Sequence, residues 1–489
     1  MSQPKIEAVG AYAPRFRVSA EKFEDAWGQF HAPGISETAV PNADEDSVTM
    51  AYEAATRALG AAERAGDEIA FLAFASTTPP VAEADLTARL GAMLGVPESA
   101  TRHEFSGSTR AGTRALDAAL SAGPWGGTGD SRNQTRDDET DRVGLVVASD
   151  CPRGEPDSPE EHAAGAGAAA FVLSESGGAE ILSRAEYAAD YPGTRFRRRG
   201  SDATEGLGVT SYDRRAFTET LAGAVEGLDG EWDPSTADAA AIQAPNGKLP
   251  YRAAGALGVE TEAIQQCATV HDLGDTGAAS VPLSLAKALA QGDERILVAA
   301  HGSGAGADAL LIENRGVAAE LALDAGESVS YAEYLRRRGE LTSGAPEGGG
   351  AYVSVPSWRR TLDQRYRLVA GKCPECAALN FPPEGACNSC KTLVEGYEDV
   401  ELPGTGTVEA ATTISQGGAP PEFAEQQAQS GDFGVAIVAL EGPGRESVSV
   451  PAQVVDSEAV AIGDRVATTI RRIYTQEGVT RYGFKVKSE

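Results

Sequence analysis

Four cysteines toward the C-terminal end of the chain have the spacing of a metal site. Cys373 and Cys376 form one C-x-x-C pair, and Cys387 and Cys390 form a second pair. Two such pairs place four thiolates on two tight turns, which matches the tetrahedral coordination of zinc. A redox dithiol is the alternative, but the segment lacks the βαβ context of such a motif. Because four thiolates leave no open coordination position, the sequence predicts a structural zinc.

Composition limits the remaining chemistry. The chain has 489 residues, 42% of them hydrophobic and 23% charged, which indicates a globular protein of more than one domain. Its net charge of −30, with eight Lys among 42 cationic residues, predicts a surface that repels nucleic acid and anionic membranes. Such a surface suits a cytoplasm of high salt. A cytoplasmic location is expected, since neither a bilayer-spanning apolar run nor a signal-peptide core is present.

Helices and strands alternate over the first 315 residues. These elements form the body of the chain and must position its candidate residues. The predicted helices cover 48–62, 84–95, 111–122, 214–228, 249–258 and 279–291. The predicted strands cover 69–76, 102–106, 143–149, 168–174, 239–244, 267–271, 295–301 and 308–313. Continuous apolar strands between helices indicate sheets buried on both faces. Because the order recurs, the sequence predicts a duplicated, five-layered α/β body.

Two polar segments divide this pattern. The insertion at 123–142 is predicted to be a solvated loop, and the Gly/Pro/Ser-rich stretch at 342–350 a linker. The expected domains are therefore a body at 1–341, the linker, and a tail at 351–489. After the cysteine segment the tail has short strands at 404–415, 434–442, 447–455 and 464–486. Even spacing of such strands indicates a small β-barrel.

A zinc ribbon that leads into such a barrel resembles the OB-fold acyl-CoA-associated family that accompanies thiolases in archaea and bacteria. The resemblance covers 351–489 and predicts a rubredoxin-like zinc ribbon followed by an OB-type barrel. Many OB barrels bind oligonucleotides. The negative charge and the sparse aromatic residues of this chain argue against nucleic acid as a partner.

The body resembles hydroxymethylglutaryl-CoA synthase, a member of the thiolase superfamily, over 1–340. The segments that carry the resemblance are PEEHAAGAGAAAFVL (159–173), QAPNGKLPYRAAGALGV (243–259), LGDTGAASVPLSLAKAL (273–289), HGSGAGADALLIE (301–313) and SYAEYLRRRGEL (330–341). The resemblance implies the duplicated thiolase-like fold. It also implies a condensation of acetyl-CoA with acetoacetyl-CoA, in which a cysteine at a helix N-terminus is acylated and a histidine and a glutamate move protons.

The same resemblance shows substitutions at the chemical positions. HEFSGSTRAGTRAL (103–116) has Thr109 at the cysteine position, with Ser108 beside it, and FASTTPPVAEADL (74–86) has Thr77 at the glutamate position. Gln243 stands at the histidine position and Asp275 at that of its asparagine partner. A threonine hydroxyl needs a base, and neither an amide nor a second threonine is one. We therefore expect condensation activity to be lost.

Other positions of the family's binding scaffold are kept. The oxyanion loop retains Gly302, Ser303 and Gly304, whose backbone amides would stabilise an oxyanion. The candidates for binding coenzyme A are Asn246, Lys248 and Arg198, of which the two cations would bind its phosphates. For Arg198 the alternative is a solvated basic run on the surface. His301 and His271 are rescue candidates for a base, but ordinary strand-end hydrogen bonds are the simpler interpretation.

Two functions remain open on this basis. The first is an acyl-CoA-binding, non-catalytic or divergent synthase-like subunit fused to a bridging module. By resemblance, it would be the partner of an acetyl-CoA acetyltransferase-like thiolase in acetoacetyl-CoA, isoprenoid or β-ketoacyl metabolism, and its body would form a homodimer. The second is an active acyltransferase that uses Thr109, Ser108 or a displaced nucleophile.

Overall fold

The computed structural model describes residues 3–123, 142–229, 233–324, 326–341, 354–415, 423–444, 446–455, 458–476 and 478–489. Nearly all of the predicted loop at 123–142 and all of the linker at 342–350 lie outside these residues. The chain divides into two compact units. Unit 1 comprises residues 1–41, 46–91 and 95–331, and unit 2 comprises residues 42–45, 92–94 and 332–489. The predicted domain boundary at 341 stays a prediction.

Unit 1 is built on a large mixed sheet whose strands lie in the order β12-β13-β14-β9-β1-β8-β6-β4-β5, with β15 beside β1. The strands are β1 (Lys5–Tyr12), β4 (Ile69–Ala75), β5 (Thr101–Phe105), β6 (Val143–Asp150), β8 (Gly167–Ser174), β9 (Ala179–Asp190), β12 (Ala239–Ile242), β13 (Arg295–His301), β14 (Ala305–Asn314) and β15 (Ala318–Ala322). Every residue of β6 and β8 is buried, as their continuous apolar sequences predict. β1 and β9 pair only through Ile6 and Ala179, so the sheet has two halves.

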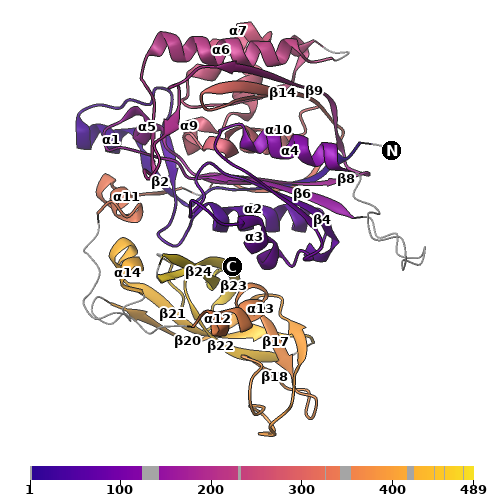
Figure 1. Cartoon of the computed structure of the whole chain (residues 1–489). Coiled ribbons are helices and arrows are strands. Elements are labelled where there is room, and N and C mark those ends of the chain that lie inside the picture. The colour runs from indigo at the N-terminus through magenta and orange to yellow at the C-terminus, as the bar shows by residue number, and fades with distance from the viewer. Residues whose placement is uncertain are drawn as a thin grey trace. The chain divides into compact units, whose positions relative to one another are not determined.

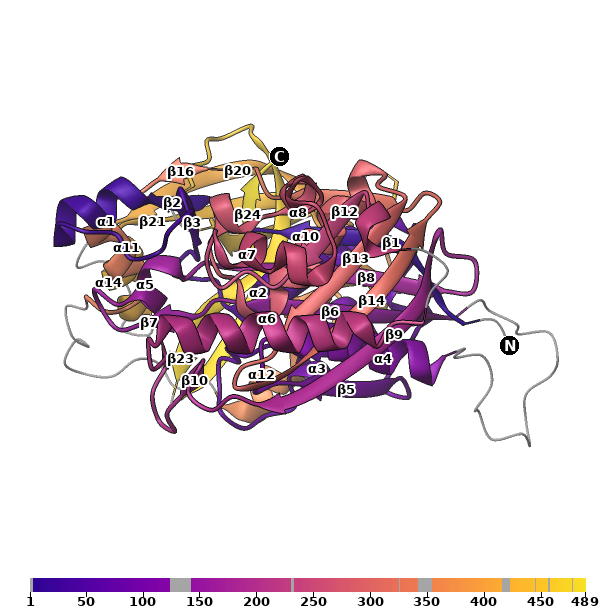
Figure 2. The same cartoon turned by 90° about the horizontal axis from the view of Figure 1, so that it is seen from above.

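Helices cover both halves and fill the space between them, and this confirms the predicted five-layered α/β body (Figure 1). The main helices are α2 (Ser47–Ala61), α4 (Ala111–Ala122), α6 (Thr210–Glu226), α7 (Leu249–Leu257) and α10 (Ser280–Gln291). α2 covers β1 and β8, α4 and α10 lie in the central layer, and α6 runs along β9 and β14 (Figure 2). α2 begins with a capping box, in which Asp46 accepts the N–H groups of Val48 and Thr49.

Shorter elements complete unit 1. They are β2 (Phe16–Ser19), α1 (Ala20–Trp27), β3 (Glu37–Val40), α3 (Leu86–Leu94), β7 (Arg153–Gly154), α5 (Pro159–Ala163), β10 (Phe196–Arg197), β11 (Ala203–Glu205), α8 (Thr261–Cys267), α9 (Val270–Leu273) and β16 (Glu327–Ser328). No helix among the described residues is long and apolar enough to cross a membrane.

One predicted strand is wrong. Residues 267–271 lie in the end of α8 and the start of α9, and not in a strand. The second half of the sheet therefore has β12, β13, β14 and β9 but no counterpart of β5 among the described residues. The apolar run C-A-T-V is too short to distinguish a strand from a buried helix segment. In the structure, Ala263, Ile264 and Cys267 form the buried stripe of α8.

Unit 2 contains a ribbon and a barrel. α12 (Val355–Arg360) and α13 (Leu362–Arg367) lead into the ribbon strands β17 (Val369–Lys372), β18 (Leu379–Asn380) and β19 (Glu398–Glu401). The barrel strands are β20 (Thr405–Ile414), β21 (Phe433–Glu441), β22 (Ser447–Gln453), β23 (Arg465–Gln476) and β24 (Val479–Ser488), in the order β22-β21-β20-β23-β24. A bridge between Val454 and Val486 brings the two edges together and nearly closes the barrel. The remaining helices of unit 2 are α11 (Tyr331–Arg337) and α14 (Ala424–Ser430).

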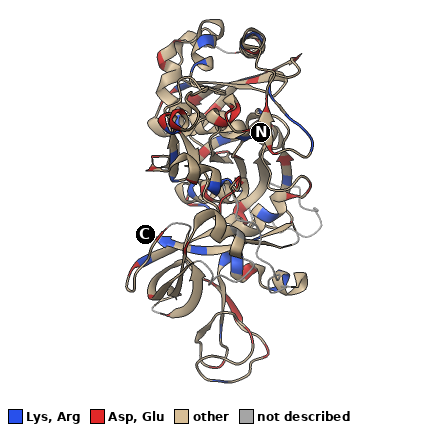
Figure 3. Cartoon of the chain, turned by 90° about the vertical axis from the view of Figure 1, so that its left-hand side faces the viewer, with Lys and Arg blue, Asp and Glu red and all other residues tan. Residues whose placement is uncertain are grey.

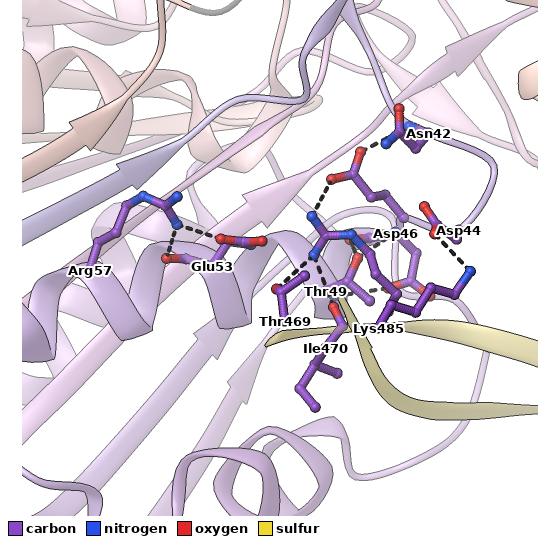
Figure 4. Close-up of polar contacts among 11 residues, drawn as sticks. Asn42, Asp44, Asp46, Thr49, Glu53, Arg57, Thr469, Ile470 and Lys485 are labelled. Carbon is purple, nitrogen blue, oxygen red and sulfur yellow. Dashed lines mark hydrogen bonds and ion pairs between the residues drawn. The ribbon is translucent and has the colours of Figure 1, made fainter. Parts of the chain in front are cut away.

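Lys and Arg residues and Asp and Glu residues are spread along both units of the chain (Figure 3). In unit 2, cationic residues are frequent on β23 and β24, which carry Arg465, Arg471, Arg472, Arg481, Lys485 and Lys487. Buried partners accompany two of these cations. The Lys485 ammonium lies 2.8 Å from the Asp44 carboxylate (Figure 4). The Arg471 guanidinium lies 3.3 Å from the Glu45 carboxylate.

Candidate functional site

A cavity of about 370 Å³ in unit 1 is lined by six of the ten residues predicted for catalysis, the oxyanion loop and coenzyme A binding. Those that line it are Thr109, Gln243, Asn246, Lys248, Asp275 and Ser303. β12 and β13 are parallel neighbours, so the residues after their C-terminal ends, Gln243 and the loop beginning at Gly302, meet at one edge of the sheet. Thr77, Arg198, Gly302 and Gly304 do not line this cavity.

Thr109 lies at the N-terminal end of α4, after a turn in which Gly107 has a φ of +77°. Its side chain is buried, and its Oγ1 donates a 2.6 Å hydrogen bond to the backbone carbonyl of His301. The Ser303 hydroxyl donates to Thr109 Oγ1 at 3.4 Å. A carbonyl oxygen is too weakly basic to take the hydroxyl proton. The Thr109 hydroxyl, at the predicted nucleophile position, is therefore held by a backbone acceptor.

The predicted oxyanion loop, residues 302–304, links β13 to β14 and packs tightly against the turn that precedes α4. A Cβ on Gly302 would lie 2.5 Å from the Ala305 carbonyl oxygen and 2.8 Å from Arg110 Cδ, so this position requires glycine. The Ser303 N–H donates to Ser108 Oγ at 3.1 Å, and the Gly304 N–H donates to Thr194 Oγ1 at 3.2 Å. Both amides already have hydroxyl acceptors, which an oxyanion would have to displace.

Gln243 and Asp275 both contact Gly277. Gln243 Nε2 donates to the Gly277 carbonyl at 2.9 Å, and Asp275 Oδ1 accepts the Gly277 N–H at 2.9 Å. The second carboxylate oxygen of Asp275 accepts a hydrogen bond from Arg195 Nη1. The pairing of Asp275 with Arg195 was not visible in the sequence, because the residues lie 80 positions apart.

Thr77 contacts a different group. Its backbone N–H and its hydroxyl each donate to the Asp150 carboxylate at 2.7 Å, and its carbonyl accepts a 2.6 Å hydrogen bond from Arg197. Asp150 is fully buried and also accepts hydrogen bonds from Ser76, Thr78 and the Ala278 N–H. This carboxylate joins the turn after β4 to the segment that holds Asp275. In the sequence, only the place of Asp150 at the end of the strand β6 pointed to this role.

The two histidines considered as bases have ordinary partners. His301 Nδ1 lies 2.9 Å from Thr220 Oγ1. His271 contacts the Tyr251 hydroxyl at 2.7 Å and the Gly34 carbonyl at 2.6 Å. The remaining single cysteines are protonated thiols, because burial raises the pKa of Cys151 and raises that of Cys267 to about 12.

The pH dependence of stability tests the environment of His301. Burial, with the charges of Arg110 and Arg195, lowers the pKa of His301 from 6.5 to about 4. The neutral imidazole is thus favoured in the folded chain, and its contribution to stability is present above pH 6.5 and lost as the pH falls toward 4. As the pH falls from about 7 to about 5, we expect the unfolding free energy of the wild type to decrease by about 2 kcal/mol more than that of His301→Gln. Urea unfolding at both pH values measures this difference. The control is His103→Gln on the exposed edge strand β5, whose unfolding free energy should change with pH as that of the wild type does.

Charged residues of both signs line the cavity. The cations are Arg195, Arg214, Lys248 and Arg252, and the acids are Glu160, Glu205, Asp213 and Asp275. Burial raises the pKa of Glu160 and of Asp213. With four cations beside four acids, the lining of the cavity is close to charge balance, whereas the whole chain has a net charge of −30.

The three coenzyme A candidates differ in their surroundings. Lys248 is exposed at the start of α7 and lines the cavity. Asn246 Oδ1 accepts the N–H groups of Lys248 and Leu249, both at 3.0 Å, so this side chain caps the helix. Arg198 is mostly exposed and lies 2.9 Å from Glu205. Their roles in binding coenzyme A stay predictions.

The four ribbon cysteines form a metal site in unit 2. Their Sγ atoms all lie within 4.8 Å of one another, with 3.9 Å between Cys373 and Cys390 and 3.6 Å between Cys376 and Cys387. A tetrahedral zinc with bonds of about 2.3 Å separates its sulfur ligands by about 3.8 Å. The residues present therefore fit the ion.

Local backbone geometry builds this site. Ala377 and Lys391, each directly after the second cysteine of a pair, have a φ of 62°. Their N–H groups donate back to the carbonyls of Cys373 and Cys387, at 2.8 and 2.9 Å. Asn380 and the Ser389 N–H donate to the Cys387 sulfur at 3.5 and 3.4 Å. Such hydrogen bonds to a thiolate orient it and stabilise its charge.

Comparisons with known proteins agree with both units. The ChsH2 rubredoxin-like zinc ribbon domain matches residues 360–394, and the ChsH2 C-terminal OB-fold domain matches residues 399–471. A hydroxymethylglutaryl-CoA synthase of Methanopyrus kandleri is 30% identical over 355 residues, which cover 69% of this chain and 97% of the relative. These matches confirm both predicted family resemblances.

Two solved structures show the same fold as unit 1. One is MvaS in complex with 3-hydroxy-3-methylglutaryl coenzyme A, with a TM-score of 0.57, 21% identity, and coverage of 72% of this chain and 95% of that one. The other is an HMG-CoA synthase complexed with CoA, with a TM-score of 0.58, 16% identity, and coverage of 72% and 94%. The predicted thiolase-like fold is thereby confirmed.

Proposed function

Because the chain belongs to the hydroxymethylglutaryl-CoA synthase family, we propose that its unit 1 binds coenzyme A thioesters without performing the family's condensation. The observation that supports this most directly is the hydrogen bond from Thr109 Oγ1 to the His301 carbonyl. Among the described residues, no side-chain base has a hydrogen bond to that hydroxyl. Gln243 and Thr77 cannot exchange protons at neutral pH, so acyl transfer lacks its base.

Coenzyme A is the proposed ligand of the cavity. The two structural neighbours hold coenzyme A or its hydroxymethylglutaryl thioester. In this chain Lys248, Arg214 and Arg252 line the cavity, and Arg198 is exposed near Glu205, a further lining residue. Their charges would attract the phosphates of the cofactor. The acyl thioester would then lie toward Thr109 and Ser303.

The partners of the chain are also proposals. β5 is an edge strand that pairs only with β4 among the described residues, and its side chains are largely exposed. An unpaired edge is a ready template for a second chain, which supports a homodimer of unit 1. We propose that the ribbon and barrel, beyond a linker at 342–350, dock an acetyl-CoA acetyltransferase-like thiolase. Loss of that thiolase from the purified complex after deletion of residues 351–489 would support this assignment.

The proposal predicts no condensation. We expect the full-length chain, in concentrated KCl with acetyl-CoA and acetoacetyl-CoA, to release no thiol and to gain no acyl mass. Thr109→Cys should acquire an acetyl adduct from acetyl-CoA, because a thiol at a helix N-terminus is far more nucleophilic than a hydroxyl. Intact-mass spectrometry and a thiol assay measure both results. Ser121→Cys, at the exposed C-terminal end of α4, is the matched control and should stay unmodified.

The alternative is an active acyltransferase that uses Thr109, Ser108 or a displaced nucleophile. Ser108 Oγ accepts the Ser303 N–H, so its own proton stays available for transfer. A wild-type acyl adduct mapped to either residue, or measurable condensation, would establish this alternative and refute the inactive subunit.

A further inference from the structure

Two arginines of unit 2 lie over the same tryptophan ring, and neither has an acidic partner among the described residues. We propose that Arg365 and Arg481, beside Trp358, form a binding site for a phosphate group. This site goes beyond the proposed binding of coenzyme A thioesters in the cavity of unit 1, and its test does not depend on that proposal.

Three elements bring these side chains together. Trp358 lies in α12, Arg365 lies in α13, and Arg481 lies in β24, against which α13 packs. The guanidinium carbon of Arg365 lies 3.9 Å from the centroid of the Trp358 ring, and that of Arg481 lies 5.2 Å from it. Tyr474, opposite Arg481 in the register of β23 and β24, meets the same ring at a centroid distance of 6.1 Å. Both guanidinium groups are thus within cation–π distance of one ring, which holds them near each other.

Most hydrogen-bond donors of the two arginines have no acceptor among the described residues. Arg481 is 8% exposed, and its Nε is buried without a hydrogen-bond partner there. Arg365 is half-buried, so a small ion can reach it from solvent, and only its Nε donates, to Thr361 Oγ1 at 2.9 Å. A guanidinium carries five N–H groups in a planar fork that matches the oxygens of a phosphate in pairs. Two such forks without acceptors therefore predict an oxyanion ligand.

The elements around the site supply positive charge and almost no negative charge. α12, β23 and β24 contain no acid, and Asp363, the one acid of α13, pairs with Arg367 at 3.1 Å. The cations of these four elements are Arg359, Arg360, Arg365, Arg367, Arg465, Arg471, Arg472, Arg481, Lys485 and Lys487. Acids from other segments pair with Arg465, Arg471 and Lys485, whereas none among the described residues pairs with either arginine of the site. In a chain with a net charge of −30, this local excess of cations favours an anionic ligand.

Charge decides which oxyanion fits. Burial lowers the pKa of Arg365, and the charge of Arg481 acts in the same direction, but a guanidinium stays protonated at neutral pH. Two neighbouring cations that are partly withdrawn from water repel each other, and a dianion relieves this repulsion better than a monoanion does. A phosphate monoester carries about 1.5–2 negative charges near pH 7, so its charge matches that of the two arginines.

Titration with inorganic phosphate tests the inference. We expect isothermal titration of the full-length protein, at a fixed KCl concentration in a buffer without other oxyanions, to show saturable binding. Arg481→Met should weaken it about tenfold, as expected for the loss of one charge-assisted hydrogen bond. Arg481→Lys keeps the charge without the planar fork and should give an intermediate affinity. Phosphoserine distinguishes the sources, because equal affinity assigns the site to the phosphate group itself and tighter binding assigns it to a phosphate monoester.

The matched control is Arg359→Met, which removes an exposed arginine directly after Trp358 and should keep the wild-type affinity. Urea unfolding guards against misfolded variants. Millimolar phosphate should raise the unfolding midpoint of the wild type and of Arg359→Met but not that of Arg481→Met, because only a bound ligand stabilises the folded chain. Absence of saturable binding, or binding that Arg481→Met leaves unchanged, would overturn the inference. Acetate that binds as tightly as phosphate would overturn the assigned class of ligand.

Discussion

Replacement of Cys387 by alanine is expected to abolish zinc binding and to unfold the ribbon at residues 369–401. Cys387 is fully buried, and its sulfur accepts hydrogen bonds from Asn380 and Ser389. Structural zinc sites contribute on the order of 10 kcal/mol to the folding of their module. Few apolar residues of the ribbon are buried, Leu379 among them, so little else holds it together. Elemental analysis should fall from one zinc per chain to none.

Limited proteolysis provides the second measurement for this prediction. Cleavage within the ribbon should accelerate strongly in Cys387→Ala and in wild-type protein treated with a chelator. Cys151→Ala is the matched control, since this cysteine lies in unit 1 and contacts Thr78. It should retain its zinc and the wild-type cleavage pattern. A Cys387→Ala chain that keeps a full equivalent of zinc would contradict the assigned ligand set.

Replacement of Lys485 by methionine is expected to destabilise unit 2 by about 3–5 kcal/mol, the usual cost of removing one partner from a buried ion pair. Lys485 and Asp44 are both fully buried and lie 2.8 Å apart (Figure 4). Methionine keeps most of the apolar volume of lysine but removes the ammonium that lies beside the buried Asp44 carboxylate. Urea unfolding followed by the fluorescence of Trp358 in unit 2 would report the loss.

A double variant separates the charge from the packing. Lys485→Met combined with Asp44→Leu removes both charges and should recover most of the lost stability, since hydrophobic replacements of buried pairs are often neutral. Arg465→Met breaks an exposed pair with Glu441 on the same barrel and should change the stability far less. Equal losses in Lys485→Met and in the double variant would show that the charge pair is not the cause.

Much of the fold follows from local sequence patterns. β6 and β8 are continuous apolar runs, and these are typical of strands buried on both faces. The exception at 267–271 is instructive. A short apolar run fits either a strand or a helix, and in the structure packing of Ala263, Ile264 and Cys267 against the body selects the helix.

The zinc site and the substituted family positions were determined by the sequence alone. All four thiolates come from residues 373–390, so backbone turns within one short segment are enough to bring them together. The residues that the family resemblance places at the chemical positions, Thr109, Gln243 and Asp275, were likewise read without any coordinates, and the loss of a cysteine–histidine mechanism stays a prediction from them.

Only the tertiary structure decided what those side chains contact. Thr109 meets a carbonyl 192 positions away, Asp275 meets Arg195, and Asp44 meets Lys485 across 441 positions. A polar side chain has several chemically acceptable partners, and local sequence does not choose among them. The choice is made when distant strands and loops pack, because burial then requires each charge and hydroxyl to find a partner.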